Sequence, residues 1–371
     1  MIRAVELWNT RIAIIHNSLT LTKESDTMNT RRLLAACMCI GLMLAIEGCS
    51  KDDVTGLQGG GQSASPADVQ AMKTMVEGGD SVSEFSASEI YSIDDNGMQG
   101  SDYDILAKAG ITPEVVRSVT TGSLVPLRWG RHIFWDQIVR HYDVTVVGDS
   151  QATVAVTKTI PGEFWIGFGT RTADSVVLDT LVKKPFTEIV KRNIIFRRVA
   201  RFLDARRNWV PVAITMVQGK SEGTSDFSIA SLELSESHWS YNTTITDPLN
   251  TWFRLGWLHR TVPLFPAGDT ITLKATVIST NDSAEIVYLR HGVGGDGFGR
   301  RRIRMNLVST IGGPGNYTRV YKKQFMTRAL TIGLPGRFNA VIDVFSYETI
   351  FDPAAPFSNE FWGCPYIVAR H

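Results

Sequence analysis

A glycine-rich stretch is the first candidate for a cofactor site in this 371-residue chain. Gly292, Gly294 and Gly297 match the G-x-G-x-x-G spacing with which dinucleotide-binding proteins hold a pyrophosphate. That fingerprint requires a helix after the glycines, because the phosphates bind at the helix N-terminus. Here an alternating, strand-like pattern follows at 302–310. The stretch therefore predicts a hairpin loop, and we expect no cofactor.

Two clusters of arginine could bind anionic groups. One contains Arg300, Arg301, Arg302 and Arg304, and the other contains Arg197, Arg198, Arg201, Arg206 and Arg207. Guanidinium groups at this density can contact phosphates, anionic lipid or acidic glycans. Arginines on solvated strand faces give the same pattern, so both interpretations stay open.

Three tryptophans gather near the middle of the chain and could form an aromatic surface for sugars. These are Trp239, Trp252 and Trp257. Exposed aromatic rings can bind sugars, whereas buried rings build cores or interfaces between domains. Exposure of the three rings on one open face would favour a glycan site, and burial would exclude it.

The residues that usually mark an active site or a metal site form no compact pattern. No histidine pair has a metal-ligand spacing, and no G-x-S-x-G elbow is present. The acidic turn Asp94–Gly97 departs from the calcium-binding loop, because Ser92 and Tyr103 stand where acidic ligands are needed. We therefore expect no metal and no enzyme. A hydrolase with carboxylates far apart in the sequence is the remaining catalytic alternative.

The elements of the first half predict an α+β domain over residues 67–240. A short helix is expected at 66–77, and a hairpin is expected where Gly148–Ser150 joins two Val/Thr-rich strands. Pro161-Gly162 predicts another turn, and 188–205 fits either a helix or a long edge strand. Further strands are expected at 209–218 and 227–234. The order of elements resembles the curved antiparallel sheets with short helices of cystatin-like and NTF2-like proteins.

The second half predicts an all-β domain over residues 250–371, after a junction at 235–255. Short strands separated by Gly/Pro turns are expected at 270–280, 285–291, 302–310, 317–326 and 337–347. Such spacing is typical of a β-sandwich. The layout resembles the immunoglobulin-like modules of bacterial surface proteins, although the Cys…Trp…Cys signature of antibody domains is absent.

The N-terminal region carries a targeting signal over residues 28–48. Arg31 and Arg32 precede an uncharged run, 33–46, which is too short to span a bilayer. Gly48-Cys49 follows, and the whole resembles a bacterial lipoprotein signal, which implies a lipid on Cys49. Cys37 lies too close to Arg32 to leave room for an apolar segment. A Gly/Ser-rich tether is predicted over 49–66. Residues 1–27 are expected to be a mis-called extension before the true start at Met28.

These expectations place the protein in the bacterial cell envelope. In the lipoprotein family, a residue other than Asp after the cysteine, here Ser50, implies the outer membrane. Only Cys364 would remain as a thiol, and we expect it to be buried. We predict a non-enzymatic, lipid-anchored protein that binds, scaffolds or assembles. The alternative is a glycan-binding accessory lipoprotein. The expected partners are the membrane and envelope proteins or glycans, with no nucleic acid.

Overall fold

The computed structural model describes residues 65–77, 125–171, 176–236, 241–255, 261–291, 301–327 and 336–369, with only the backbone at Arg171, Val176, Val177 and Arg301. All of these residues belong to one compact unit, Val54–His371. The predictions for the signal, the tether before Ser65, Asp94–Gly97 and the glycine stretch 292–297 lie outside the described residues.

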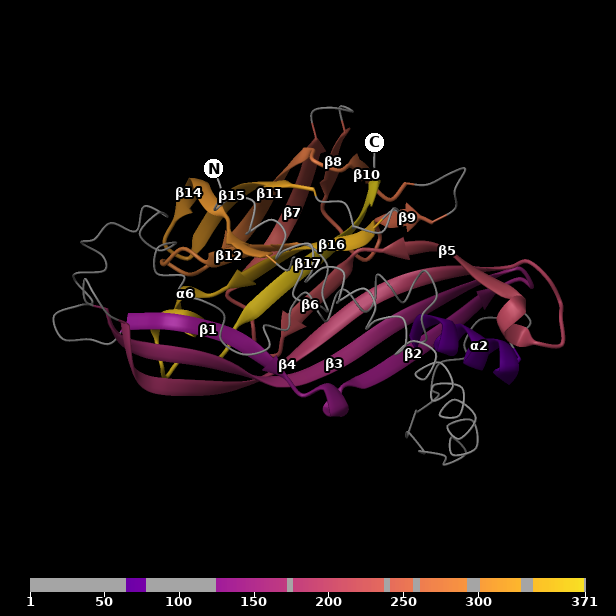
Figure 1. The fold of residues 1–371 in the computed structure, drawn as a ribbon, viewed down its shortest axis with the longest axis horizontal. Coiled ribbons are helices and arrows are strands. Elements are labelled where there is room, and N and C mark those ends of the chain that lie inside the picture. The colour runs from indigo at the N-terminus through magenta and orange to yellow at the C-terminus, as the bar shows by residue number, and fades with distance from the viewer. Residues whose placement is uncertain are drawn as a thin grey trace, which may run out of the picture. The chain divides into compact units, whose positions relative to one another are not determined.

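Most of the described strands form one large sheet, called sheet A (Figure 1). Its main order is β1-β3-β4-β6-β17-β16-β12-β13, with β2 beside β3, β5 between β4 and β9, and β10 beside β17. The β10–β17 pair is parallel, and the other pairs are antiparallel. The strands are β1 (Val125–Ile133), β2 (Val139–Val147), β3 (Gln151–Arg171), β4 (Val176–Arg198), β5 (Trp209–Thr215), β6 (Val217–Ser221), β9 (Trp252–Arg254), β10 (Leu264–Pro266), β12 (Ile286–His291), β13 (Arg301–Arg304), β16 (Gly336–Phe345) and β17 (Asn359–Ala369).

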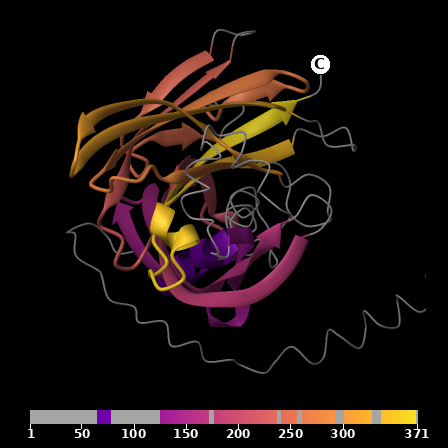
Figure 2. The ribbon, with the colours of Figure 1, turned by 90° about the vertical axis from the view of Figure 1, so that its left-hand side faces the viewer.

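A second antiparallel sheet, sheet B, has the order β14-β15-β11-β7-β8. Its strands are β7 (Phe227–Glu236), β8 (Tyr241–Ile245), β11 (Thr270–Ser279), β14 (Asn306–Gly313) and β15 (Asn316–Met326). The helical elements are α2 (Pro66–Glu77), α6 (Tyr347–Phe351) and the short 3₁₀ turns η1 (Trp135–Gln137) and η2 (Ala205–Arg207). Figure 2 shows the long strands β3 and β4 curving around α2, so sheet A is curled.

The first hydrophobic core lies between the two sheets. In β11 the inward residues Ile271, Leu273, Ala275 and Val277 are all buried, which confirms the predicted alternation. They share this core with residues of β16 and β17, such as Ile342. An antiparallel sheet with one packed face shows this period-2 pattern because successive side chains point to opposite faces.

A second core lies on the other side of β16, against β3 and β4 of sheet A, whereas the α2 residues belong to the first core. Val341 and Phe345 pack there with Phe164 of β3 and Phe186 of β4, whereas their neighbours Ile342 and Val344 belong to the first core. Both faces of β16 are therefore covered, and nine of its ten residues are buried. This explains why apolar residues such as Val341 and Ile342 follow one another in β16 instead of alternating with polar ones.

Helix α2 has the predicted bounds and docks on sheet A through its first turn. The Ser65 hydroxyl accepts a hydrogen bond from the Asp68 backbone N–H at 3.1 Å and so caps the helix. The Asp68 carboxylate accepts from the Trp209 indole N–H at 2.8 Å and from Arg198 at 2.7 Å. Met72 and Met75, on the predicted apolar face, are buried. Burial and these hydrogen bonds together hold α2 in place.

Two predictions about the long strands are decided by the pairing. The hairpin around Gly148 is confirmed, with Val147 opposite Gln151. The segment 188–205 is strand as far as Arg198, within β4, and it is paired along both sides by β3 and by β6 or β5. It is therefore neither a helix nor an edge.

The predicted turn at Pro161-Gly162 is wrong, because β3 runs through both residues. The Pro161 carbonyl accepts from the Phe134 N–H at 3.0 Å, so the backbone of Pro161 faces the gap between β1 and β2. The missing N–H of proline therefore breaks no strand ladder there. A Cβ on Gly162 would lie 2.5 Å from the Phe186 ring, so close packing requires the glycine.

A β-rich fold with a curled antiparallel sheet and a second sheet is confirmed, but an α+β N-terminal domain is not what the described residues form. Strands from both predicted domains enter each sheet: β6 pairs with β17, and β7 pairs with β11. The expected boundary at 240–250 therefore does not separate the sheets. The comparison with cystatin-like, NTF2-like and immunoglobulin-like modules stays a prediction.

Candidate functional site

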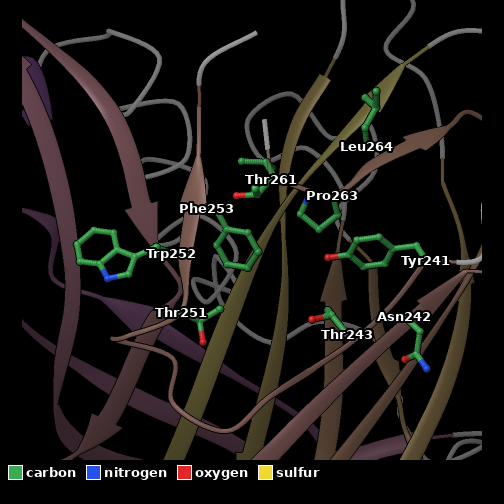
Figure 3. Close-up of a pocket in the computed structure, with 10 residues that line it drawn as sticks. Tyr241, Asn242, Thr243, Thr251, Trp252, Phe253, Thr261, Pro263 and Leu264 are labelled. Carbon is green, nitrogen blue, oxygen red and sulfur yellow. The ribbon is translucent and has the colours of Figure 1, made fainter. Parts of the chain in front are cut away.

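An open pocket of about 650 Å³ lies where sheet B meets sheet A (Figure 3). Its lining comes from β8, from β9 and from the segment that leads into β10. The lining residues are Tyr241, Asn242, Thr243, Thr251, Trp252, Phe253, Thr261, Val262, Pro263 and Leu264. All of them lie within 24 residues of sequence. The pocket lining is therefore local in sequence, whereas the sheets that hold it are built from distant strands.

The loop between β8 and β9 is held in shape by its own hydrogen bonds. Asp247 Oδ1 accepts from the backbone N–H groups of Leu249 and Asn250, each at 3.1 Å, and the Thr251 hydroxyl donates to the Asp247 carbonyl at 2.7 Å. The Asn193 amide of β4 donates to the Leu249 carbonyl at 3.0 Å. This arrangement fixes Thr251 and the start of β9 against sheet A.

The other walls of the pocket are tied to the same sheet. Phe253 lies opposite Ile214 of β5, and the Arg254 N–H donates to the Thr261 hydroxyl at 2.7 Å. The Pro263 carbonyl accepts from the Ile367 N–H of β17 at 2.8 Å, and β10 continues that pairing. The third wall, β8, pairs with β7 of sheet B. All three wall segments are therefore held by strand pairing, which preorganises the pocket.

The lining combines aromatic surface with uncharged polar groups. Tyr241, Trp252 and Phe253 supply rings, and Asn242 with three threonines supplies amide and hydroxyl groups. Among the described residues, the lining includes no Asp, Glu, Lys or Arg. Such a surface suits a neutral ligand that offers both hydroxyl groups and an apolar face.

The hydroxyl of Tyr241 is a hydrogen-bond donor over the working range of pH. Burial, with a smaller contribution from nearby Cys364, raises the pKa of Tyr241 above its ordinary value. The ring is fixed edge-on against Phe265, with 5.7 Å between centroids. Figure 3 shows its hydroxyl directed toward the side of the pocket where Phe253 lies.

Of the three predicted sugar-binding tryptophans, the structure describes only Trp252, which does line the pocket. Trp239 and Trp257 lie outside the described residues. Trp252 is half-buried, and Figure 3 shows its indole on the other side of β9 from the Phe253 ring, away from Tyr241 and Thr243. The expectation that three tryptophans share one face is therefore not tested. Trp252 lies at the border of the pocket and not at its base.

The predicted anion site around 300–304 is described only in part. Arg300 and the side chain of Arg301 lie outside the described part of the chain. The guanidinium of Arg302 donates to the Trp129 carbonyl at 3.1 Å and lies over the rings of Trp129 and Tyr288 at 5.5 and 5.1 Å. Arg302 and Arg304 are both half-buried. Arg302 therefore packs against aromatic rings, and the strands on either side of the glycine stretch pair as an antiparallel hairpin.

A pair of carboxylates does meet inside the protein, but in a buried cluster that we call the ionic centre. Arg131 donates hydrogen bonds to Glu188 at 2.9 Å and to the two oxygens of Asp343 at 2.7 and 2.8 Å. Arg290 also donates to Asp343, at 2.7 Å. The Asn359 amide donates to the same carboxylate at 2.5 Å. The Arg131, Glu188 and Asp343 side chains are fully buried.

The environment shifts the pKa values of the two carboxyl groups of the ionic centre in opposite directions. Burial raises the pKa of Glu188 to about 7, although Arg131 acts against it. Burial alone would also raise the pKa of Asp343, but the guanidinium groups of Arg131 and Arg290 lower it to about 2. Among the described residues, Glu188 Oε2 accepts no hydrogen bond, whereas both oxygens of Asp343 are bonded. The charges stabilise one another, and neither carboxylate faces solvent.

Other candidates for chemistry contact neighbouring side chains within the fold. Cys364 is buried and unpaired, as expected, and burial raises the pKa of its thiol to about 12, which makes it a poor nucleophile. His132 and His291 stack on Trp165 and Phe325, with centroid distances of 5.1 and 4.5 Å. Within the described ranges, no three His, Cys, Asp or Glu side chains gather as a metal site. No helix of the described part is long and apolar enough to cross a membrane.

Sequence reasoning singled out Trp252 but missed Tyr241 and the threonines. The signal that could have found them is the alternation of Tyr241 and Thr243 in a short strand at the predicted junction. It missed the ionic centre entirely, because Arg131 and Asp343 are 212 residues apart. In the comparisons with known proteins, no family model, no curated protein and no solved structure matches this chain.

Proposed function

We propose that this chain is a non-enzymatic, lipid-anchored protein of the bacterial envelope that binds a neutral, hydroxyl-bearing ligand, a glycan, in the pocket at β8, β9 and β10. The observation that carries the proposal is the uncharged lining of rings and hydroxyl groups around a volume of about 650 Å³. Sugars present an apolar ring face and a rim of hydroxyl groups, and this pairing matches that lining.

A non-catalytic role is supported by the surroundings of the acidic groups. Glu188 and Asp343 are bound by arginine and buried at the centre of the protein. An inverting or retaining glycosidase needs two carboxyl groups on either side of a substrate. The described part of the pocket lining offers none, so we propose binding without turnover.

The envelope location rests on the sequence signal that ends at Cys49. We propose that Cys49 carries the lipid and that Ser50 directs the protein to the outer membrane. Mass spectrometry of the protein purified from its own cells should find an acylated N-terminus at Cys49. An unmodified N-terminus at another residue would refute the anchor without affecting the pocket.

The ligand is tested by screening neutral and acidic oligosaccharides on an array. The full chain with Cys49→Ser is used, so that no acyl chain contributes. We expect neutral glycans to bind and Tyr241→Phe to weaken them about fivefold, the effect of one lost hydrogen bond of about 1 kcal/mol. Tyr317→Phe, which removes a hydroxyl bonded to Asp282 at 3.1 Å on sheet B, is the matched control. The proposal would be contradicted if no neutral glycan bound the Cys49→Ser chain, or if the Tyr241→Phe and Tyr317→Phe variants bound glycans equally well.

Among the described strands β14 is paired along one side only, and this edge favours assembly as a second function. This strand reads NLVSTIGG, and seven of its eight residues are exposed, including Val308 and Ile311. Edge strands without charge or proline are templates for pairing with another strand. An envelope protein that adds a strand here would use backbone hydrogen bonds. Crosslinking in cells through a photoreactive residue at position 308 tests this role, and the absence of any adduct would exclude it.

A further inference from the structure

The turn between β4 and β5, residues 197–208, presents apolar and cationic groups at one end of sheet A, and we call it the arginine hairpin. Leu203 is 109 % exposed, and Phe202 is 54 % exposed beside it. Val199 on the same turn is also exposed. Isolated apolar residues at the surface are ordinary, but a contiguous apolar tip needs an explanation.

Hydrogen bonds hold this tip, so its exposure is built into the fold. The Val199 N–H donates to the Asn208 carbonyl at 2.7 Å. The Asn208 side chain, itself buried, accepts from the Phe202 N–H at 2.5 Å and donates to the Phe202 carbonyl at 3.0 Å. Asp204 caps the short turn η2 through the Arg206 N–H at 3.1 Å. The backbone therefore keeps Phe202 and Leu203 pointing away from the core.

Positive charge surrounds the apolar tip. The turn carries five arginines and one acidic residue, Asp204. Arg198 is used inside the fold, bonded to Asp68 at 2.7 Å and stacked on Trp209 at 4.6 Å. The other four, Arg197, Arg201, Arg206 and Arg207, are exposed. Arg201 also pairs with Asp149, and Arg207 lies 4.9 Å from the Phe202 ring centre.

The neighbouring hairpin between β2 and β3 extends the same surface. The Arg198 N–H donates to the Ser150 carbonyl at 2.8 Å, which fixes the two turns side by side. Val147, at the end of β2, is 59 % exposed and adds apolar area. Figure 1 shows both turns at the same end of sheet A, beside α2.

We propose that the arginine hairpin docks on an anionic lipid bilayer, with Phe202 and Leu203 inserted among the acyl chains and the exposed arginines at the headgroups. Apolar residues with a cationic rim bind membrane interfaces through buried apolar area and attraction to anionic lipid. A protruding tip needs no pocket of matching shape in a fluid bilayer, whereas a protein partner would have to supply one. The contact is independent of Cys49 and would fix which end of sheet A meets the membrane.

The test is cosedimentation of the full chain with phosphatidylcholine vesicles that contain or lack phosphatidylglycerol, with Cys49→Ser in every arm. Residues 33–46 are common to all arms, so differences report on the hairpin. We expect phosphatidylglycerol to strengthen binding, and salt to weaken it. The Phe202→Ser/Leu203→Ser and Arg197→Gln/Arg206→Gln double variants should each bind at least about tenfold more weakly.

The matched control is Val308→Ser/Ile311→Ser on β14, which removes exposed apolar groups that belong to another edge of the protein. It should bind vesicles as the parent does. Leu203→Trp should bind at least as tightly as the parent, because tryptophan favours the interface. Equal binding by all variants, or equal binding to both kinds of vesicle, would overturn the proposal. Arginine-dependent binding to soluble polyglutamate, unaffected by Phe202→Ser/Leu203→Ser and without vesicle binding, would overturn it in favour of an acidic protein partner.

Discussion

The pocket and the ionic centre gather polar side chains in opposite ways. The pocket takes its described lining from ten residues between 241 and 264, is open to solvent, and has no charged side chain among those ten. The ionic centre takes one residue from each of five strands, β1, β4, β12, β16 and β17, and buries four of them with formal charge. The comparison separates polar groups that can meet a ligand from polar groups that hold strands together.

The difference follows from what each arrangement costs. A buried charge requires a partner at close range. The four charged side chains of the ionic centre can therefore meet only when the strands that carry them are paired in sheet A. Uncharged hydroxyl and amide groups at an open pocket can bond to water when no ligand is present. We therefore expect substitutions in the ionic centre to change stability, and substitutions in the pocket to change binding.

The largest expected effect is that of Asp343→Asn. It leaves Arg131 and Arg290 buried with less compensating charge, and breaking a buried pair of this kind costs about 3–5 kcal/mol. Urea unfolding measures the change. Asp149→Asn, at the exposed pair with Arg201, is the control and should cost less than about 1 kcal/mol. Similar losses in the two variants would remove the distinction between the ionic centre and the surface.

The next effect is a dependence of stability on pH that comes from Glu188. Its pKa rises from an ordinary value of 4.5 to about 7 in the folded protein, so the folded state binds the proton more tightly than the unfolded chain. Its contribution to stability is therefore complete below pH 4.5 and is lost as the pH rises to about 7, by on the order of 3 kcal/mol.

Urea midpoints measured between pH 4.5 and 7.5 test this dependence. The unfolding free energy of the parent should fall across this range. Glu188→Gln should flatten the curve, because the amide does not titrate. Glu163→Gln, at a half-buried carboxylate on β3 that pairs with Lys183, is a control that should keep the slope. A parent curve that rises with pH would show that Arg131 outweighs the burial of Glu188.

The same contrast explains how much of the molecule could be predicted. Helix α2, the hairpin at Gly148 and the alternating strand β11 depend on neighbours in sequence, and their patterns predicted them correctly. Trp252, the described member of the predicted tryptophan cluster, lines the pocket, whose described walls lie close together in sequence. Pairings such as β6 with β17 join residues about 140 apart, and no local pattern records them.

Two prolines show why proline is an unreliable signal for the end of a strand in this sequence. Pro161 suggested a turn, although β3 runs through it, and β17 runs through Pro365. Both prolines lie where a long strand changes its partner on one side: β2 gives way to β1 beside Pro161, and β6 gives way to β10 beside Pro365. A proline is tolerated in such a gap, because no partner waits for its N–H. The tertiary pairing decides this, so the sequence alone could not.

A smaller effect is expected where sheet A supports the pocket. Asn193→Ala removes the hydrogen bond from the β4 amide to the Leu249 carbonyl, which should cost about 1 kcal/mol. Hydrogen exchange should quicken at Leu249 and Asn250, and glycan binding should weaken. Asn242→Ala, at an exposed amide of the lining, should leave exchange in the loop unchanged. A loop unaffected by Asn193→Ala would mean that the turn around Asp247 holds its shape alone.

The smallest effect on stability should come from Thr243→Val, which keeps the shape of the side chain and removes one hydroxyl from the pocket. Thr243 is half-buried on β8 and its side chain also bonds that of Tyr241, so the unfolding free energy should change by less than about 1 kcal/mol. Glycan affinity should nevertheless fall several-fold, because a hydroxyl that bonds the ligand is lost. Urea unfolding and array binding of the same preparation give both values. A variant that loses stability but keeps its affinity would place Thr243 with the residues that hold strands together, and would remove the contrast between the pocket and the ionic centre.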